Sequence, residues 1–243
     1  MLSKNQIKLI TSLKQKKFRN QHGFFVAEGL KTINELLESS FELFHLFSIQ
    51  SFNINVKNET LISEGELKKI SFLKTPNQAL AIFQIPKPNS IDNEQLIIAL
   101  DTVRDPGNLG TIIRLCDWFG IKDLICSYET VDCFNPKVIQ ASMGSIARVN
   151  VSYVDLIEYL SETTLEVSGA FMNGENIYKT DLPKRGILIL GNEANGISQP
   201  IEKLINKRLS IPRFGTLKAT ESLNVATATA IFLSEFRRNF TET

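Results

Sequence analysis

Polar and charged residues gather at three places in the sequence, each directly after a short apolar run. The three stretches are DTVRDPGNLGTIIR (101–114), LILGNEANGIS (188–198) and LSIPRFGTLKATESLNVATATA (209–230). In an open α/β sheet, ligands bind beyond the carboxyl ends of the strands. If the apolar runs are strands of such a sheet, the three stretches are its loops, and we expect the functional site among them.

The first stretch predicts a turn followed by a helix. Asp-Pro-Gly-Asn at 105–108 favours a turn, and Asn108 can cap the helix that follows. Gly110 and Arg114 lie one helical turn apart on the same face, which leaves room beside the guanidinium for a flat or anionic group. The neighbouring residues are apolar, so we expect the guanidinium to need a partner. The alternative is that Arg114 simply extends to solvent.

The second stretch contains glycines at which a ligand can approach the backbone. Gly191 and Gly196 permit positive φ and close contact. No G-x-G-x-x-G pattern occurs in the chain, which argues against a nucleotide-dependent enzyme of the ordinary doubly wound type. Glu193 is the only acid of this loop, and it is either a functional group or an ordinary surface carboxylate.

The third stretch carries polar groups to the start of the last helix. Pro212 ends the preceding strand, and Gly215 begins a polar passage. Ser222 or Asn224 can cap the helix, which accounts for one polar residue. Four such residues stand close together at 220–224, so we expect some of them to serve a site.

The elements that must position these loops alternate along the second part of the chain. Unbroken apolar strands alternating with helices predict a parallel sheet covered on both faces. We expect strands at 95–101, 121–127, 146–154, 165–172, 185–193 and 208–212, and helices at 107–120, 135–144, 155–163, 198–207 and after Asn224.

The first part of the chain predicts a smaller α/β domain. We expect an amphipathic N-terminal helix with Ser3 as cap, strands at 24–29, 41–49 and 77–86, and helices at 30–40 and from Ser63. The Pro- and Asn-rich stretch PKPNSIDNE (86–94) predicts a linker. The expected division is therefore a first domain at 1–87, a linker at 88–95 and a second domain at 96–243.

The charges are unevenly placed, although the net charge is only +1. Residues 1–19 hold only basic charges and no acid, a pattern that fits either a solvated helix face or an edge that contacts phosphates. The basic residues are Lys4, Lys8, Lys14, Lys16, Lys17 and Arg19.

Cysteine and histidine usage argues against a metal site. The three cysteines have no metal-ligand spacing, and there are only two histidines. The odd cysteine count and the lack of a signal peptide favour a reduced, cytoplasmic compartment. The longest apolar runs are too short to span a membrane.

The three loops, taken in order, resemble the motifs of the SpoU (TrmH-type) branch of the SPOUT RNA methyltransferases. The resemblance rests on DPGNLGTIIR, LILGNEANGIS and IPRFG…ESLNVATATA, with ASMGSIARV (141–149) as further support. The first part, with KKFRNQHGFFVAEGLK and TPNQALAIF, resembles the small substrate-binding domain that precedes the methyltransferase domain in many of these enzymes. The match spans nearly the whole chain.

The resemblance implies a fold, a cofactor and a reaction. It implies a C-terminal parallel-sheet domain with a deep trefoil knot, preceded by a small α/β domain like that of a ribosomal protein. It implies S-adenosylmethionine as methyl donor, a ribose 2′-hydroxyl of structured RNA as acceptor, and a homodimer formed through the C-terminal domain. Ribosomal RNA is the expected substrate. Transfer RNA, or a non-catalytic role in RNA binding or ribosome assembly, is the alternative.

The resemblance also implies roles for individual residues. The catalytic motifs contain Asn108, Arg114, Glu193, Ser222 and Asn224. The cofactor-holding positions are Leu190, Gly191, Ile211 and Leu223, and RNA contacts are expected from Lys14, Lys16, Lys17, Arg19, Arg213 and Lys218.

Two features depart from the family pattern. Arg213 stands where the family usually has Met, and the passage from Gly215 to Ser222 is longer than usual.

Overall fold

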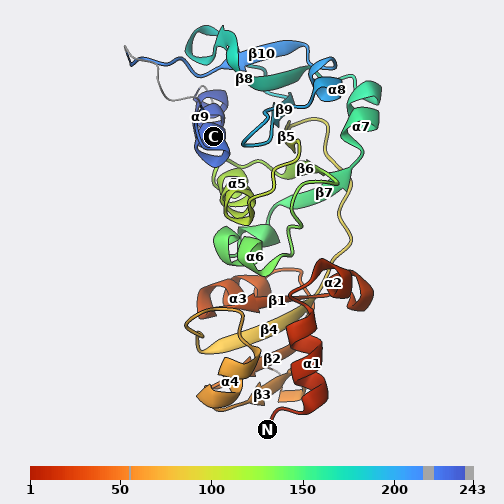
Figure 1. Cartoon of the computed structure of the whole chain (residues 1–243), viewed down its shortest axis with the longest axis vertical. Coiled ribbons are helices and arrows are strands. Elements are labelled where there is room, and N and C mark those ends of the chain that lie inside the picture. The colour runs from red at the N-terminus through yellow and green to blue at the C-terminus, as the bar shows by residue number, and fades with distance from the viewer. Residues whose placement is uncertain (55, 216–221, 239–243) are drawn as a thin grey trace. The chain divides into compact units, whose positions relative to one another are not determined.

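The computed structural model describes the chain except for residues 55, 216–221 and 239–243 (Figure 1). The described residues form two compact units. The first consists of the described residues of Met1–Lys87 together with Asp132–Arg148, and the second consists of the described residues of Pro88–Val131 and Val149–Thr243. The sequence-based division assigned 132–148 to the second domain, whereas in the structure this segment packs within the first unit.

The first unit is built on a four-stranded sheet in the order β1-β4-β2-β3. β4 pairs antiparallel with both β1 and β2, and β2 pairs parallel with β3. Only the short strand β3 was not expected from the sequence. The elements are α1 (Lys4–Ser12), α2 (Lys16–His22), β1 (Phe24–Glu28), α3 (Leu30–Leu37), β2 (Leu43–Ser48), β3 (Glu59–Leu61), α4 (Glu64–Ile70), β4 (Ala79–Gln84) and, from the second segment, α6 (Pro136–Ser142).

The two faces of this sheet are covered by different helices. On one face, Val26, Phe47 and Leu80 pack in a buried cluster with Leu13 and with Leu67 of α4. On the other face α3 and α6 pack on β1. There the ring of Phe25 lies 4.8 Å from that of Phe134, centroid to centroid. The segment 132–148 is therefore part of the hydrophobic core of the first unit.

The N-terminal helix expected from the sequence is divided into α1 and α2 by a turn. Ser3 caps α1 as expected, in a reciprocal arrangement with Gln6. The carbonyl oxygens of Leu13 and Lys14 in the turn each accept a hydrogen bond of 2.9 Å from Nη1 of Arg19. The guanidinium of Arg19 thus stabilises the turn between α1 and α2. The spacing of apolar residues could not predict this turn.

Arg19 is a buried structural residue, and the prediction that it contacts RNA is wrong. Its side chain is almost fully buried, and its guanidinium forms an ion pair with Asp132 of the segment 132–148. Nε donates to Oδ2 of Asp132 at 2.9 Å, and Nη2 donates to the same oxygen. Since the guanidinium is committed to a carboxylate and two carbonyls, it has no free face for a phosphate.

The second unit contains a six-stranded sheet in the order β10-β8-β9-β5-β6-β7. Every pair of neighbouring strands is parallel, as the sequence predicted. The elements are β5 (Leu96–Leu100), α5 (Pro106–Trp118), β6 (Asp123–Ser127), β7 (Asn150–Val154), α7 (Leu156–Glu162), β8 (Val167–Asn176), β9 (Gly186–Leu190), α8 (Gln199–Glu202), β10 (Lys207–Ser210) and α9 (Val225–Arg237).

Helices cover both faces of this sheet (Figure 1). Ile97 and Ile187 project to the face where Leu156 of α7 and Ile201 of α8 complete a buried cluster. On the opposite side α5 and α9 pack against each other. Arg237 joins them further, because its Nε and Nη2 donate to the carbonyls of Phe119 and Gly120 at the end of α5. No helix within the described ranges is long and apolar enough to cross a membrane.

Several elements differ in length from the sequence-based expectation, among them α8, β7 and β8. α8 ends at Glu202 because Asn206 pairs with Val167 of β8, through a backbone bond and a side-chain bond of 2.8 Å each. The strand expected at 146–154 begins only at Asn150, since 145–147 form a single turn of 3₁₀-helix. β8 runs on to Asn176, beyond its expected end.

The buried pair of Arg19 and Asp132 generates a prediction about stability. Arg19→Met should lower the free energy of unfolding of the first unit by about 3 kcal/mol, because it leaves a mostly buried carboxylate and two carbonyls without their donor. Lys17→Met, which removes an exposed charge from the same helix, should change it by less than about 0.5 kcal/mol. Urea unfolding followed by circular dichroism measures both. Equal stabilities of the two variants would contradict the structural role of Arg19.

Candidate active site

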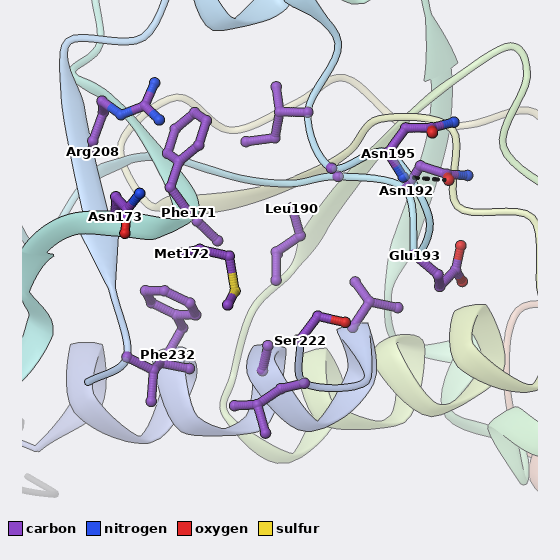
Figure 2. Close-up of a pocket in the computed structure, with 18 of the residues that line it drawn as sticks. Phe171, Met172, Asn173, Leu190, Asn192, Glu193, Asn195, Arg208, Ser222 and Phe232 are labelled. Carbon is purple, nitrogen blue, oxygen red and sulfur yellow. Dashed lines mark hydrogen bonds between the residues drawn. The ribbon is translucent and has the colours of Figure 1, made fainter. Parts of the chain in front are cut away.

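Two of the three polar stretches, the loop after β9 and the segment from β10 to α9, border one cavity of about 1150 Å³ in the second unit (Figure 2). The loops after β9 and β10 and the start of α9 form its walls, and β8 contributes the rest. Figure 2 shows Phe171, Met172 and Phe232 on one side and Glu193 with its neighbours on another. The carboxyl ends of β9 and β10 therefore open onto the cavity, as expected for an open parallel sheet.

A hydrogen-bonded chain of side chains connects the three stretches. Nδ2 of Asn108, in α5, donates to Oε1 of Glu193 at 2.8 Å. Nδ2 of Asn224, at the start of α9, donates to Oδ1 of Asn108 at 2.9 Å. Asn108 thus uses both ends of its amide to hold a residue of the second loop and a residue of the third.

Asn108 is free for this role because another residue caps α5. The expectation that Asn108 caps the helix is wrong. The cap is Asp105, whose Oδ1 accepts from the backbone amide of Asn108 at 2.8 Å. Pro106 follows the cap inside the first turn, where its missing amide costs nothing. The side chain of Asn108 is therefore not needed as a cap and bonds to the other two stretches.

Asn224 combines the two roles that the sequence left open. Its Oδ1 accepts from the backbone amides of Ala226 and Thr227 at 2.9 and 3.2 Å, so it caps α9. Its Nδ2 is the group that binds Asn108. Ser222 lines the cavity, and Asn224 alone provides the cap.

A third asparagine, which the sequence analysis did not single out, fixes the loop after β9. Nδ2 of Asn192 donates to the carbonyl of Thr102 at 2.7 Å, and its Oδ1 accepts from the amides of Ala194 and Asn195. Thr102 has a φ of 61°, which is unusual for a β-branched residue. The side chain of Asn192 therefore ties the loop to a strained position at the end of β5. Only the adjacency to Glu193 could have indicated it.

The glycines of this loop allow its backbone to fold closely on itself. Asn192 and Gly196 exchange two backbone hydrogen bonds of 2.9 Å. A Cβ atom on Gly191 would lie 2.1 Å from the carbonyl carbon of Gly196, so no side chain fits there. Gly196 itself has a φ of 68°. The close approach expected from the sequence is a contact of the loop with itself.

All four residues expected to hold a cofactor line the cavity. Leu190 and Gly191 come from the end of β9, Ile211 follows β10, and Leu223 precedes α9. Leu190 is buried, whereas Leu223 is 47% exposed. Residues of three separate segments thus border the same space.

An irregularity in β8 provides the part of the wall that the sequence did not predict. In the pairing of β8 with β10, Gly169 lies opposite Arg208, but the next residue of β10, Leu209, lies opposite Glu175. The residues in between are released from this ladder, and Ala170–Asn173 line the cavity. A Cβ on Gly174 would lie 2.6 Å from the carbonyl oxygen of Arg208, so glycine is required where the pairing resumes.

Arg114 lies on the exposed face of α5. It is not among the described residues that line the cavity. Its neighbours Ile112, Ile113 and Cys116 are buried on the other side of the helix. These apolar neighbours therefore lie on a different face of the helix from Arg114. Trp118, one turn further along the same face, is 82% exposed.

The basic residues expected to contact RNA belong to both units. Lys14, Lys16 and Lys17 are exposed in the first unit, and Arg213 is exposed beside the cavity of the second. Lys218 lies outside the described residues.

The cysteine closest to these motifs is suited to packing. Cys116 of α5 is buried, and burial raises the pKa of its thiol far above the ordinary range. A thiol that stays protonated is a poor nucleophile. Within the described part of the chain, no group of three or more His, Cys, Asp and Glu side chains is arranged to hold a metal ion.

The amide of Asn108 generates a prediction about charge. Asn108→Asp should place a second carboxylate against Glu193 and lower the stability of the second unit by about 1 kcal/mol at pH 7. The loss should fade towards pH 3, where carboxyl groups are protonated and no longer repel. Adding Glu193→Gln should restore most of it, because the new amide can donate to Asp at position 108. Thermal unfolding at both pH values measures the effect, and a loss that Glu193→Gln does not relieve would contradict the contact.

Comparison with known proteins assigns the two parts of the chain to families. Residues 95–234 match the SpoU rRNA methylase family, and residues 4–81 match the MRM3-like substrate binding domain. The chain is 30% identical to the 23S rRNA (guanosine(2553)-2′-O)-methyltransferase RlmP of Bacillus subtilis over 97% of both sequences.

Solved structures agree over the full length. A TrmH-family protein from Porphyromonas gingivalis superposes with a TM-score of 0.90 at 38% identity, covering 98% of this chain and 99% of that one. An rRNA methyltransferase from Sinorhizobium meliloti, solved with bound AdoMet, gives 0.88 at 29% identity, covering 100% and 97%. The chain therefore belongs to the SpoU rRNA methylase family and carries an MRM3-like substrate-binding domain in front of the methylase domain.

Proposed function

We propose that the protein transfers a methyl group from S-adenosylmethionine to a ribose 2′-hydroxyl of ribosomal RNA. The observation that carries the proposal is the chain Asn224–Asn108–Glu193, which links the three motif loops beside one cavity. Relatives that match most of the chain support the reaction, since RlmP is named as a 2′-O-methyltransferase of 23S rRNA.

The relatives favour ribosomal RNA over transfer RNA. RlmP and the Sinorhizobium meliloti rRNA methyltransferase match nearly the whole chain. A TrmH/SpoU tRNA-modifying enzyme from A. aeolicus covers only 59% of it, with a TM-score of 0.51. The substrate-binding domain at 4–81 thus accompanies the rRNA enzymes in these comparisons.

The cavity fits S-adenosylmethionine in size and in chemistry. Its volume of about 1150 Å³ is ample for a ligand of this size. Backbone groups at Leu190, Gly191, Ile211 and Leu223 would hold the polar parts of the cofactor, and Met172 and Phe232 offer apolar surface. When bound, the cofactor supplies an electrophilic methyl group that an oxygen can take in line, without a metal ion.

The residues of the site would act mainly by positioning. The attacking hydroxyl must lose a proton, but a guanidinium does not give up its own near neutral pH and is no general base. Arg114 would therefore bind an RNA phosphate and orient the 2′-hydroxyl beside it. Glu193 and Asn224 fix Asn108 between them, and Ser222 would bind the nucleotide from the cavity wall.

RNA affinity would come from exposed basic residues in both units. Lys14, Lys16 and Lys17 would contact phosphates in the first unit, and Arg213 would do so beside the cavity. Lys218 belongs to the same proposal. A cytoplasmic location is part of the same proposal.

The proposal includes a trefoil knot in the methylase domain and a homodimer formed through it. The exposed face of α5 around Trp118 and the neighbouring α9 are the surfaces that a partner would cover. A large exposed aromatic side chain supports such an interface.

Arg114 provides the main test of the reaction. Arg114→Ala should lower kcat for methyl transfer to RNA by at least about 100-fold, while the Kd for S-adenosylmethionine, measured by calorimetry, stays unchanged. Arg114→Lys should recover only part of the loss, because an ammonium lacks the planar pair of donors. Arg185→Ala removes an exposed arginine elsewhere in the unit and serves as control. Near-normal turnover in Arg114→Ala would exclude this role.

The dimer is tested by equilibrium sedimentation. At micromolar concentration the protein should sediment with twice the 27.3 kDa mass of one chain. Trp118→Asp should shift the equilibrium towards monomer by placing a charge in the interface. A wild-type protein that is monomeric throughout would exclude this part of the proposal.

A further inference from the structure

The N-terminus of α3 in the first unit is an uncapped helix end that opens into a second cavity. Gly29 occupies the cap position with a φ of 91° and provides no side-chain acceptor. No acidic residue stands in the first turn. The amides of Leu30, Lys31 and Thr32 therefore point out of the helix without a capping partner, and the helix dipole adds partial positive charge there.

The cavity in front of this helix end has a volume of about 310 Å³. It is lined by Gly29–Thr32 and by amide and thioether side chains from two other segments of the same unit, namely Asn77, Gln78, Gln140 and Met143. A Cβ on Gly29 would lie 3.2 Å from Nδ2 of Asn77, so a side chain here would crowd the cavity wall. The glycine thus keeps the cavity open and allows the turn into the helix.

Thr32 gives the second indication of a ligand. Thr32 is only 5% exposed, and it lines the cavity. A buried threonine in a helix commonly bonds to the carbonyl four residues earlier, as Thr229 does in α9. Thr32 makes no side-chain hydrogen bond with any described residue. Its hydroxyl is therefore a donor available to whatever fills the cavity.

The charges around the cavity favour an anion. The ammonium group of Lys31 is exposed at its edge. The neighbouring carboxylates are engaged elsewhere: Glu28 accepts from Ser71 and from the amide of Phe72, and Glu35 pairs with Arg148. Neither glutamate lines the cavity. The accessible groups are backbone amides, a hydroxyl, amide side chains and one ammonium.

We propose that this cavity binds a phosphate group of the RNA backbone. Backbone amides at a helix N-terminus, a hydroxyl donor and one lysine are the groups that recognise a tetrahedral phosphate anion. The choice of RNA as the source of that phosphate rests on the proposed function. The cavity is larger than one phosphate needs, and the side-chain amides of Asn77 and Gln140 would contact the adjoining sugar.

The first experiment tests the phosphate site directly. Backbone amide resonances of the full-length, ¹⁵N-labelled protein are followed by NMR during titration with inorganic phosphate at constant ionic strength. The amides of Leu30–Thr32 should shift and saturate, and Thr32→Val should weaken this binding about threefold to tenfold by removing one hydrogen bond. The first turn of α4, which is capped by Ser63, is the internal control and should not shift.

The second experiment tests the source of the phosphate. Filter binding measures the Kd for in vitro-transcribed large-subunit ribosomal RNA at several salt concentrations. Lys31→Gln should raise the Kd about threefold to tenfold and lower the salt slope by about one. Lys69→Gln, an exposed lysine of α4 outside the cavity, should leave both unchanged. Lys16→Gln/Lys17→Gln, measured in the same series, reports on the N-terminal lysines.

Each result has a defined meaning. Saturable shifts with phosphate but wild-type RNA affinity in Lys31→Gln and Thr32→Val would overturn RNA as the source and leave a site for free phosphate. Absence of both effects would overturn the site. If the variants weaken RNA binding but the wild-type protein transfers no methyl group, the proposed reaction fails and this inference stands. Circular dichroism of Thr32→Val and Lys31→Gln confirms that the first unit is folded.

Discussion

The side-chain amide of Asn108 is the contact on which the arrangement of the candidate site depends. An amide has one acceptor and one donor end, and here the two ends bind groups from two different loops. A carboxylate at position 108 would repel Glu193, and an aliphatic residue would hold neither partner. The three loops come from positions far apart in the sequence, and Asn108 is the residue that bonds to both of the other two.

The surrounding backbone makes that use of Asn108 possible. Asp105 caps α5 and so frees the Asn108 side chain, while Asn224 caps α9 with its oxygen and keeps its nitrogen for Asn108. Asn192 ties the loop after β9 to Thr102. Asp105, Asn224 and Asn192 thus each use one side-chain atom to bond a local backbone group. The other atom of the two asparagine side chains bonds to a different segment of the site. This explains why polar residues are so dense in the three stretches: each helix start and turn needs its own acceptor before any group is available to a ligand.

The sequence predicted the parts of the fold that depend on local pattern. The parallel sheet, its strands and the caps at Ser3 and Ser63 follow from apolar runs and capping residues. Long-range partners were not predictable in the same way. The spacing of apolar residues in α2 does not indicate that Arg19 contacts Asp132, which lies 113 residues further along the chain. The register shift of β8, which creates a wall of the cavity, depends on contacts with β10 that the local sequence does not encode.

The first unit depends on a segment that the sequence pattern assigns elsewhere. Asp132 neutralises the buried guanidinium of Arg19, and Phe134 packs on Phe25 in the core. A fragment ending at residue 87 would retain Arg19 without its carboxylate and Phe25 without its aromatic neighbour. The free-energy cost of a buried unpaired charge is several kcal/mol, a large part of the stability of a domain this small. The first unit therefore needs the segment 132–148 to complete its core and to pair its buried charge.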